Sequence, residues 1–466
     1  MKHALARLLP PNAFAFAAFP RSGVVGERTP PRRRWMVVGL VALCAAGCGG
    51  RAKVAAAPAV PEGFTRDEVQ AILRHSPLPD PPPDPTNRFA DDERAARLGR
   101  FLFFDRRLSK SGEVACATCH APDRGWSDGR QLATGEGDLQ RHSMTLLNVA
   151  YNRWFFWDGR ADSLWAQALQ PLEDPREHGG SRLEVAHLLH GDPQLREAYT
   201  EVFGALPELS DAARFPRRGR PVPDDAAHPD AKAWASMSPA DRAAVDAVFV
   251  NVGKALAAFE RGIVSRGSRF DVFVEGLVEH DPEKQRALSA SERNGLKLFV
   301  GRAGCSVCHA GPNFTDREFH NTRVPPLAGA EKPGRADPGR YAGIDLVAES
   351  PFRGTGAFSD APAGAAEDKL AYLLKSGHTW GEFKTPSLRD ASRTAPYMHR
   401  GQFATLGEVL RFYNTLEGAA PAQHAAERIL VPLGLSEAEL ADLAAFLDAL
   451  AGSPLPEHLR RQPAFP

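Results

Sequence analysis

Apolar side chains recur three or four residues apart in several stretches of the chain, which is the spacing of one face of an α-helix. Residues 91–104, 239–261 and 437–451 show this pattern. A fourth helix is predicted at Ser289-Ala-Ser-Glu292, because a serine followed three residues later by glutamate forms a capping box. No region is rich in predicted strands, so the sequence predicts a mainly α fold.

Two other stretches have the composition of irregular chain. Residues 49–87 are rich in Ala and Pro and end in a run of prolines and aspartates, which predicts a flexible tether. Residues 324–380 are rich in Gly, Pro and Ala and are expected to form a long loop. A chain of 466 residues exceeds one ordinary hydrophobic core. We place the domain boundary near residue 283, which gives domains 88–283 and 284–466.

The first 48 residues have the features of a secretion signal. Arg32-Arg33-Arg34 precede an apolar run over residues 36–46, which is too short to span a bilayer. Ala45-Ala46-Gly47 before Cys48 resembles a bacterial lipobox, in which Cys48 becomes an acylated N-terminus. A plain signal peptide, cut a few residues later, is the alternative. Both signals predict a periplasmic protein, and the first adds a lipid anchor at a membrane surface.

The net charge of the chain indicates which classes of partner it can bind. The full sequence carries 57 basic and 57 acidic residues. Without residues 1–48 the balance becomes 50 basic against 56 acidic residues, a net charge of −6. This balance argues against a nucleic-acid partner and favours a basic redox protein.

Four of the six cysteines form two short motifs. Cys116-Ala-Thr-Cys119-His120 and Cys305-Ser-Val-Cys308-His309 have the C-x-x-C-H spacing at which two thiols bond the vinyl groups of one haem. The histidine is then placed to ligate the iron. A zinc ribbon would place its two pairs closer than the 189 residues found here, and disulfide bonds would not explain the histidines. The sequence therefore predicts two covalently attached c-type haems.

The sequence around the two motifs repeats loosely. Gly99-Arg-Phe-Leu-Phe103 precedes the first motif, and Gly295-Leu-Lys-Leu-Phe299 precedes the second. After each motif come an aromatic residue, a hydroxyl residue and an aspartate, as Trp126-Ser-Asp128 and Phe314-Thr-Asp316. Two copies of a small cytochrome c unit account for the repeat, so we expect two cytochrome c-like haem domains in tandem with long loops.

Four further blocks resemble the bacterial di-haem cytochrome c peroxidases and their MauG relatives. The blocks are Leu102-Phe-Phe-Asp-Arg-Arg-Leu108, Phe156-Trp-Asp-Gly-Arg-Ala161, Phe383-Lys-Thr-Pro-Ser-Leu-Arg389 and Thr394-Ala-Pro-Tyr-Met-His-Arg-Gly401. The resemblance covers about residues 88–455, with the blocks in the family's order. It implies a peroxide-reactive haem in the first domain and an electron-transfer haem in the second.

The resemblance implies roles for five residues. Trp157 matches a tryptophan that lies between the haems and relays electrons. Gln167 and Glu177 match the residues that orient peroxide and move its proton at the first haem. His399 matches the histidine of its block, and Tyr413 stands where the peroxidases have a methionine ligand of the second haem and MauG has a tyrosine. Without the resemblance, Trp157 would be a core residue, Glu177 a surface charge and Gln167 a helix-face residue.

The chain departs from the family pattern in two places. Thr134-Gly135-Glu136 replaces a Thr-Gly-His loop whose histidine ligates the first haem in the resting peroxidases. A calcium site in the family uses an asparagine and two backbone carbonyls that match Thr394 and Pro396, but His142 stands at the asparagine position. His142 could cap a loop, replace that asparagine or reach the first iron. Met398 is a rival of Tyr413 as a ligand of the second iron.

These features together predict a periplasmic di-haem peroxidase. Its first haem, on His120, would reduce hydrogen peroxide. A small cytochrome c or copper protein would supply electrons through the second haem, on His309. MauG-like oxidation of a protein or small organic substrate is the alternative activity, and a non-catalytic electron carrier is the alternative class. An open, peroxide-reactive first haem distinguishes the enzymes from the carrier.

Overall fold

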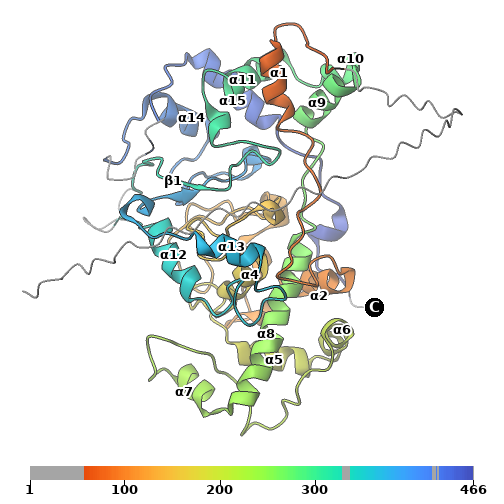
Figure 1. The fold of residues 1–466 in the computed structure, drawn as a ribbon. Helices are drawn as coiled ribbons and strands as arrows, with labels where there is room; N and C mark the ends of the chain where they lie inside the picture. Colours follow the sequence, from red (N-terminus) through yellow and green to blue (C-terminus); the bar gives the residue numbers. More distant parts are fainter. Residues whose placement is uncertain (1–56, 328–335, 422–426, 428–429, 465–466) are drawn as a thin grey trace, which may run out of the picture. The chain divides into compact units, whose positions relative to one another are not determined.

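Figure 1 shows the computed structural model, which describes residues 57–327, 336–421, 427 and 430–464. This part of the chain is mainly helical, as predicted. Its two named strands, β1 (Phe319–His320) and β2 (Phe383–Lys384), pair antiparallel. No helix in these ranges combines the length and the apolar character that crossing a bilayer requires. The α-helices are α1 (Arg66–Leu73), α2 (Glu93–Phe104), α3 (Cys116–Cys119), α4 (Leu164–Glu173), α5 (Arg182–Gly191), α6 (Pro193–Phe203), α7 (Pro229–Ser236), α8 (Pro239–Glu260), α9 (Arg269–Glu279), α10 (Pro282–Gln285), α11 (Ala290–Val300), α12 (Arg340–Glu349), α13 (Ala365–Ala371), α14 (Leu406–Thr415) and α15 (Glu437–Asp448).

The four predicted helices are present as α2, α8, α11 and α15. Each begins at a side chain that accepts a hydrogen bond from an amide of the first turn, which would otherwise be unpaired. The capping residues are Asp92, Ser238, Ser289 and Ser436. Ser289 and Glu292 form the predicted capping box.

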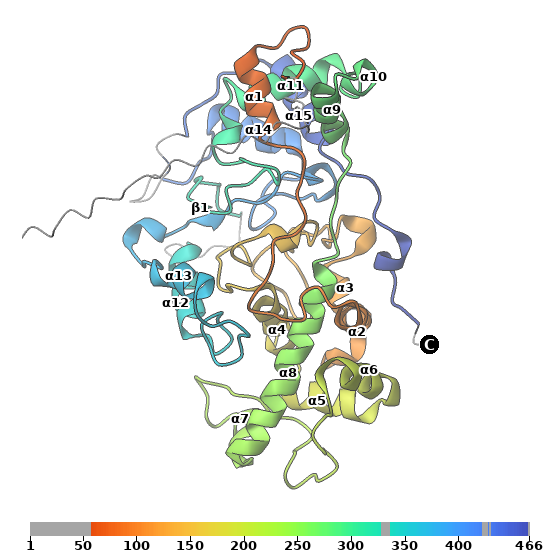
Figure 2. The same ribbon diagram turned by 45° about the vertical axis from the view of Figure 1, so that its right-hand side comes forward.

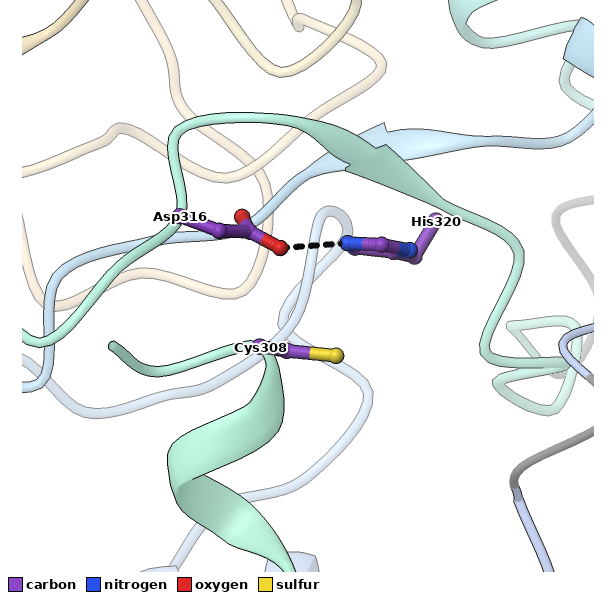
Figure 3. A group of neighbouring side chains, drawn as sticks. All are labelled: Cys308, Asp316 and His320. Atoms are coloured by element: carbon purple, nitrogen blue, oxygen red, sulfur yellow. Dashed lines mark hydrogen bonds and ion pairs between the residues drawn. The ribbon is translucent and has the colours of Figure 1, made fainter. Parts of the chain in front are cut away.

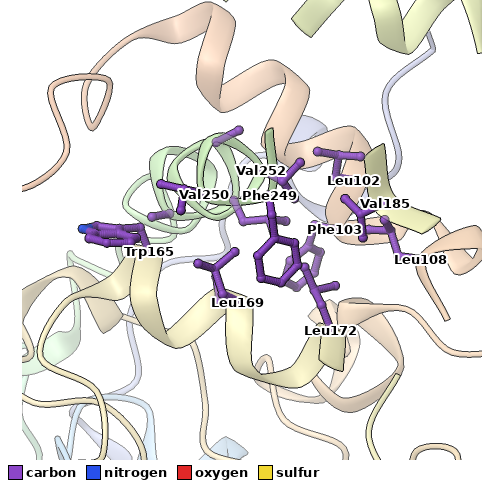
Figure 4. Packing of buried hydrophobic residues seen from close by; sticks show 14 of the residues in the cluster. Leu102, Phe103, Leu108, Trp165, Leu169, Leu172, Val185, Phe249, Val250 and Val252 are labelled. Atoms are coloured by element: carbon purple, nitrogen blue, oxygen red, sulfur yellow. The ribbon is translucent and has the colours of Figure 1, made fainter. Parts of the chain in front are cut away.

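The first hydrophobic core lies where α2 and α4 pack against α8 (Figure 4). Phe103, Trp165 and Phe249 are among its fully buried side chains. Gly99 marks the crossing of α2 and α8, because a Cβ there would lie 1.9 Å from the backbone oxygen of Ala255. Only glycine allows the two helices this approach, so the helix before the first cysteine motif is fixed against α8.

A second core forms around the crossing of α11 and α15, with Phe299 and Phe446 buried in it. Gly295 has the same role here as Gly99 has in the first core. A Cβ on Gly295 would lie 2.0 Å from the backbone oxygen of Asp442. The glycine that repeats in the sequence therefore permits one close helix crossing next to each cysteine motif.

The predicted tether over residues 49–87 is wrong for its described part. Thr65 makes a capping box at the start of α1, whose Val69 and Ile72 are buried in the second core. Figures 1 and 2 show α1 beside α11. His75 lies within 3.3 Å of the backbone oxygen of His309, through its Nε2. Residues 1–56, with the predicted signal and Cys48, lie outside the described residues.

Two other expectations about chain organisation need correction. Phe270 and Phe273 of α9 belong to the second core, so the predicted boundary near residue 283 lies too late in the chain. Residues 324–380 are not one loop, because they contain α12 and α13, and Phe352 packs in the first core. The C-terminal Leu459 also packs against the first core. Each core therefore draws on segments that are distant in sequence.

Candidate haem sites and distal residues

The first cysteine motif forms a single helical turn, α3, that ends at His120. Neither Cys116 nor Cys119 is in a disulfide bond, so both thiols are available to a haem. The Nδ1 atom of His120 lies 3.3 Å from the backbone oxygen of Trp126, which fixes Nδ1 as the protonated nitrogen and leaves the Nε2 lone pair for a metal. Burial lowers the pKa of this imidazole, which keeps it in the neutral form that binds iron.

The second motif repeats this geometry. Cys305 and Cys308 are also free thiols, and His309 Nδ1 lies 3.0 Å from the backbone oxygen of Phe314. Burial again lowers the pKa of the imidazole. Trp126 and Phe314, which hold the two histidines, have φ angles of 59° and 50° and so turn their carbonyls back onto the ring. The donor set in both places fits a c-type haem.

Glu177 follows α4, and its carboxyl group is close to the first motif. Burial raises its pKa to about 7, and the positive charge of Arg160 opposes that rise. The Glu177 charge acts on both Cys116 and Cys119, so the carboxyl lies in the neighbourhood of the two thiols. Gly135 allows this placement, because a Cβ there would come within 2.5 Å of the Glu177 backbone oxygen.

Gln167 is on α4 and is half-buried. Within the described residues its side-chain amide makes no hydrogen bond, whereas Gln170, one turn later, is bonded to Arg160 at 3.1 Å. Gln167 therefore lies on α4, and Glu177 lies in the segment that follows this helix. The Gln167 amide is available to a ligand.

Trp157 connects the two halves of the described chain. Its indole Nε1 donates to the backbone oxygen of His142 at 2.9 Å, and its own backbone oxygen accepts from the amide of Lys384 at 2.8 Å. Its side chain is buried. One residue therefore contacts a loop that follows the first haem motif and a strand that follows the second.

Tyr413, on α14, is near the second motif. Burial raises the pKa of its hydroxyl to about 12, a hydrogen bond from Thr322 opposes the rise, and both Cys305 and Cys308 act on it electrostatically. Met398 instead occupies a left-handed turn, with φ of 71°, that Gly401 closes. His399, the histidine of that block, stacks on Phe383 at 3.7 Å between ring centres.

His142 caps a loop, one of its three predicted roles. Its Nδ1 lies 2.7 Å from the backbone oxygen of Arg130, and its Nε2 lies 3.5 Å from the hydroxyl of Ser127. Glu136, at the position of the family's histidine, is bonded to the amide and hydroxyl of Ser111 at 2.9 and 2.6 Å. That contact lowers the pKa of Glu136 and holds it at the surface. Both side chains are thus occupied elsewhere.

The candidate calcium ligands Thr394 and Pro396 lie in a loop beside Gly125. The hydroxyl of Thr394 donates to the backbone oxygen of Ala391 at 3.2 Å. Calcium prefers oxygen ligands, and the nearby position 142 offers an imidazole that is already hydrogen-bonded. Calcium at this loop stays a prediction.

Cys308, Asp316 and His320 form the one cluster of metal-ligand types within the described residues (Figure 3). His320 bonds Asp316 at 2.7 Å and Glu427 at 2.8 Å, and its pKa is raised to about 11, chiefly by Asp316. Because Cys308 is a haem-attachment residue, the cluster is better described as an ion-paired histidine beside the second haem than as a separate metal site.

Sequence reasoning did not single out two buried charged residues next to the haem motifs. Glu260, the last residue of α8, has an Oε2 atom without a hydrogen-bond partner in the described residues, and its charge acts on Cys116. Lys384 on β2 is 2% exposed. The sequence signal for their burial is weak: Glu260 ends an otherwise apolar stretch of α8, and Lys384 follows Phe383 in a short block.

Comparisons with known proteins agree with this geometry. A sequence model of the family "Di-haem cytochrome c peroxidase" matches residues 93–279. The cytochrome-c peroxidase IdrP1 of Pseudomonas sp. (strain SCT) is 32% identical over 84% of this chain and 89% of its own. The methylamine utilization protein MauG of Methylorubrum extorquens is 33% identical over 89% of this chain and 95% of its own.

A solved structure gives the same result. The crystal structure of a MauG-like protein associated with microbial copper homeostasis has a TM-score of 0.55 and 26% identity, over 83% of this chain and 98% of the other. The resemblance inferred from the sequence blocks is confirmed, and with it the two covalently bound c-type haems that both cysteine motifs and both histidines fit. The chain belongs to the di-haem cytochrome c peroxidase and MauG family.

Proposed function

We propose that this protein is a periplasmic di-haem peroxidase that reduces hydrogen peroxide with electrons from a small redox protein. Two cytochrome c-like domains in tandem would carry the haems, with the reactive haem on His120 and the electron-transfer haem on His309. Glu177 carries the proposal: it is a carboxyl group with a pKa of about 7, near both thiols of the first haem motif. Reduction of peroxide requires an acid–base group at the haem, whereas electron transfer alone does not.

The proposed chemistry assigns one step to each distal side chain. When bound, the first haem supplies the iron at which peroxide, two electrons and two protons give two molecules of water. Glu177 accepts a proton from one peroxide oxygen and returns it to the other, which a carboxyl with a pKa near the working pH does efficiently in both directions. Gln167 orients the peroxide through its unbonded amide.

Electrons would reach this site through Trp157, because that residue contacts segments next to both haem motifs. The donor would be a basic small cytochrome c or copper protein, which fits the net charge of −6 of residues 49–466. The secretion signal in residues 1–48 would place the protein in the periplasm, and a lipid anchor on Cys48 would hold it at a membrane surface.

The direct test is steady-state reduction of hydrogen peroxide by the purified holoprotein, with a reduced small cytochrome c as donor. Oxidation of the donor that depends on peroxide, and that Glu177→Gln suppresses while both haems stay attached, is the expected result. A fully haem-loaded protein that exchanges electrons with the donor but does not react with peroxide would identify a carrier instead.

Tyr413 favours a second candidate, MauG-like oxidation of a protein or small organic substrate. An anionic oxygen ligand on the second iron would stabilise its higher oxidation states. Burial raises the pKa of the Tyr413 hydroxyl to about 12, so the iron itself would have to displace the proton, as bound metal ions do. Peroxide consumption without a cytochrome donor, coupled to chemical modification of an added substrate, would support this activity.

A further inference from the structure

Lys384 is a buried lysine beside the second haem motif. It is the last residue of β2, and only 2% of its surface is exposed. Its amide bonds the backbone oxygen of Trp157 at 2.8 Å. Two residues later, the backbone of Pro386 is within hydrogen-bonding reach of the His309 imidazole. Lys384 therefore belongs to the short segment that joins Trp157 to the iron ligand of the second haem.

The ammonium group of Lys384 has no anionic partner within the described residues. Asp316 is the one carboxylate that acts on it there. That carboxylate is already bonded to His320 Nε2 at 2.7 Å and to the amide of Glu318 at 3.0 Å. Burial consequently lowers the pKa of Lys384 to about 8. The ammonium group of Lys384 is therefore removed from water, and no carboxylate of the described residues is in direct contact with it.

Three other buried cations of the described residues have partners in the protein, and one of them, Arg340, donates to the backbone oxygens of Asp158 and Gly159 at 3.3 and 2.8 Å rather than to a carboxylate. Lys254 donates to Asp360 at 2.7 Å, and Arg389 donates to Asp271 at 2.8 Å. Removing an ammonium group from water costs several kcal/mol unless an opposite charge compensates it. The contrast indicates that Lys384 is placed for an anion that the polypeptide does not supply.

We propose that Lys384 binds a propionate carboxylate of the second haem and thereby raises the reduction potential of that haem. A c-type haem carries two propionates, and attachment at Cys305, Cys308 and His309 places this haem next to the segment that carries Lys384. A fixed positive charge disfavours the ferric state, which is one charge more positive than the ferrous state. The proposal rests on the bound haem and not on the proposed peroxidase activity.

The test is a spectroelectrochemical titration of the purified holoprotein, in which the two haems are followed by their separate absorption and electron paramagnetic resonance signals. Lys384→Met should lower the ferrous-to-ferric ratio of the second haem about tenfold at a fixed electrode potential, which corresponds to about 59 mV for one electron. Lys384→Arg should retain most of the wild-type potential, because it keeps the charge. Lys254→Met, which removes a buried lysine paired within the protein, is the matched control and should leave both potentials unchanged.

Lys384→Gln provides a second neutral variant if the methionine variant does not fold, and it should shift the second haem in the same direction. Unchanged potentials in a folded neutral variant would overturn the proposal, as would a shift confined to the first haem. A shift of the second haem in a protein that shows no peroxide turnover would support the lysine–propionate contact and refute only the peroxidase activity.

Discussion

The indole Nε1 of Trp157 donates a hydrogen bond of 2.9 Å to the backbone oxygen of His142. This bond attaches Trp157 to the loop that follows the first haem motif. Trp157→Phe removes this bond and the indole ring together. We expect the first haem of that variant to react with peroxide normally. Its re-reduction by the second haem should slow by about tenfold or more, since each 1.4 kcal/mol added to a barrier slows a step tenfold.

Stopped-flow mixing of the half-reduced protein with peroxide separates these two steps. Trp154→Phe, a buried tryptophan three residues earlier that stacks with Arg340 instead, is the control. Equal re-reduction rates in the wild-type and Trp157→Phe proteins would exclude Trp157 from the electron route.

Replacement of Glu177 by Gln should reduce peroxide turnover by about 10²–10⁴-fold, the usual loss when a positioned acid–base group is removed. The pH profile gives an independent check. Because burial raises the Glu177 pKa to about 7, the wild-type rate should rise as pH increases through about 7, as the proton-accepting form appears. Glu136→Gln, which alters a carboxylate already bonded to Ser111, should change neither the rate nor the profile.

Tyr413, rather than Met398, should ligate the second haem iron. Tyr413→Phe should then alter the low-spin ferric signal in electron paramagnetic resonance spectra, because the iron loses an oxygen ligand. Met398→Leu should leave that signal unchanged. The opposite pair of results would assign a thioether ligand, which raises the reduction potential, and would favour an ordinary cytochrome-linked peroxidase.

The first haem should be five-coordinate or bound only by water in the oxidised protein. The two side chains that could compete for its iron are engaged elsewhere: Glu136 with Ser111, and His142 with the Arg130 carbonyl. We therefore expect one high-spin and one low-spin ferric signal, and an immediate spectral change on mixing with peroxide. Two low-spin signals, and no reaction until one haem is reduced, would contradict the prediction and make His142→Ala the first variant to examine.

Glu260 should make the protein less stable as pH rises from about 4 to about 8. Burial raises its pKa to about 8, above the value of an unfolded glutamate, so the folded state favours the protonated form. The contribution of Glu260 to the free energy of unfolding is fully present below about pH 4 and is lost as pH rises toward 8. The free energy of unfolding then falls by up to about 1.4 kcal/mol per pH unit.

Thermal unfolding of the holoprotein at pH 5 and pH 9 would measure this effect. Glu260→Gln keeps the shape of the side chain and cannot ionise, so its advantage over the wild type should appear at pH 9 and be small at pH 5. The exposed Glu457→Gln is the control. An equal difference at both pH values would show that Glu260 is not titrating in the folded protein.

The parts of the structure that depend on short sequence patterns were predictable. The capping box at Ser289 and the cysteine–histidine spacing specify local geometry. The repeat that contains Gly99 and Gly295 was visible in the sequence, but the close helix crossings that these glycines permit were found only in the structure. The rest depends on which segments meet in space. Val69 packs against residues of the second core that lie more than a hundred positions later in the chain, and no local pattern predicts such a contact. Lys384 lies in a strand of two residues, which is too short to show a periodic pattern. The burial of Glu260 likewise could not be predicted from the local sequence.

The docking of α1 on the second core sets an order for folding. Helix α1 is the first described element to emerge, whereas its neighbours α11 and α15 are among the last. Contacts this distant along the chain form slowly, so Val69 and Ile72 stay uncovered until the C-terminal helices arrive. A C-terminal fragment starting at residue 284 would lack α1 and α9, and would expose the apolar surface that they cover.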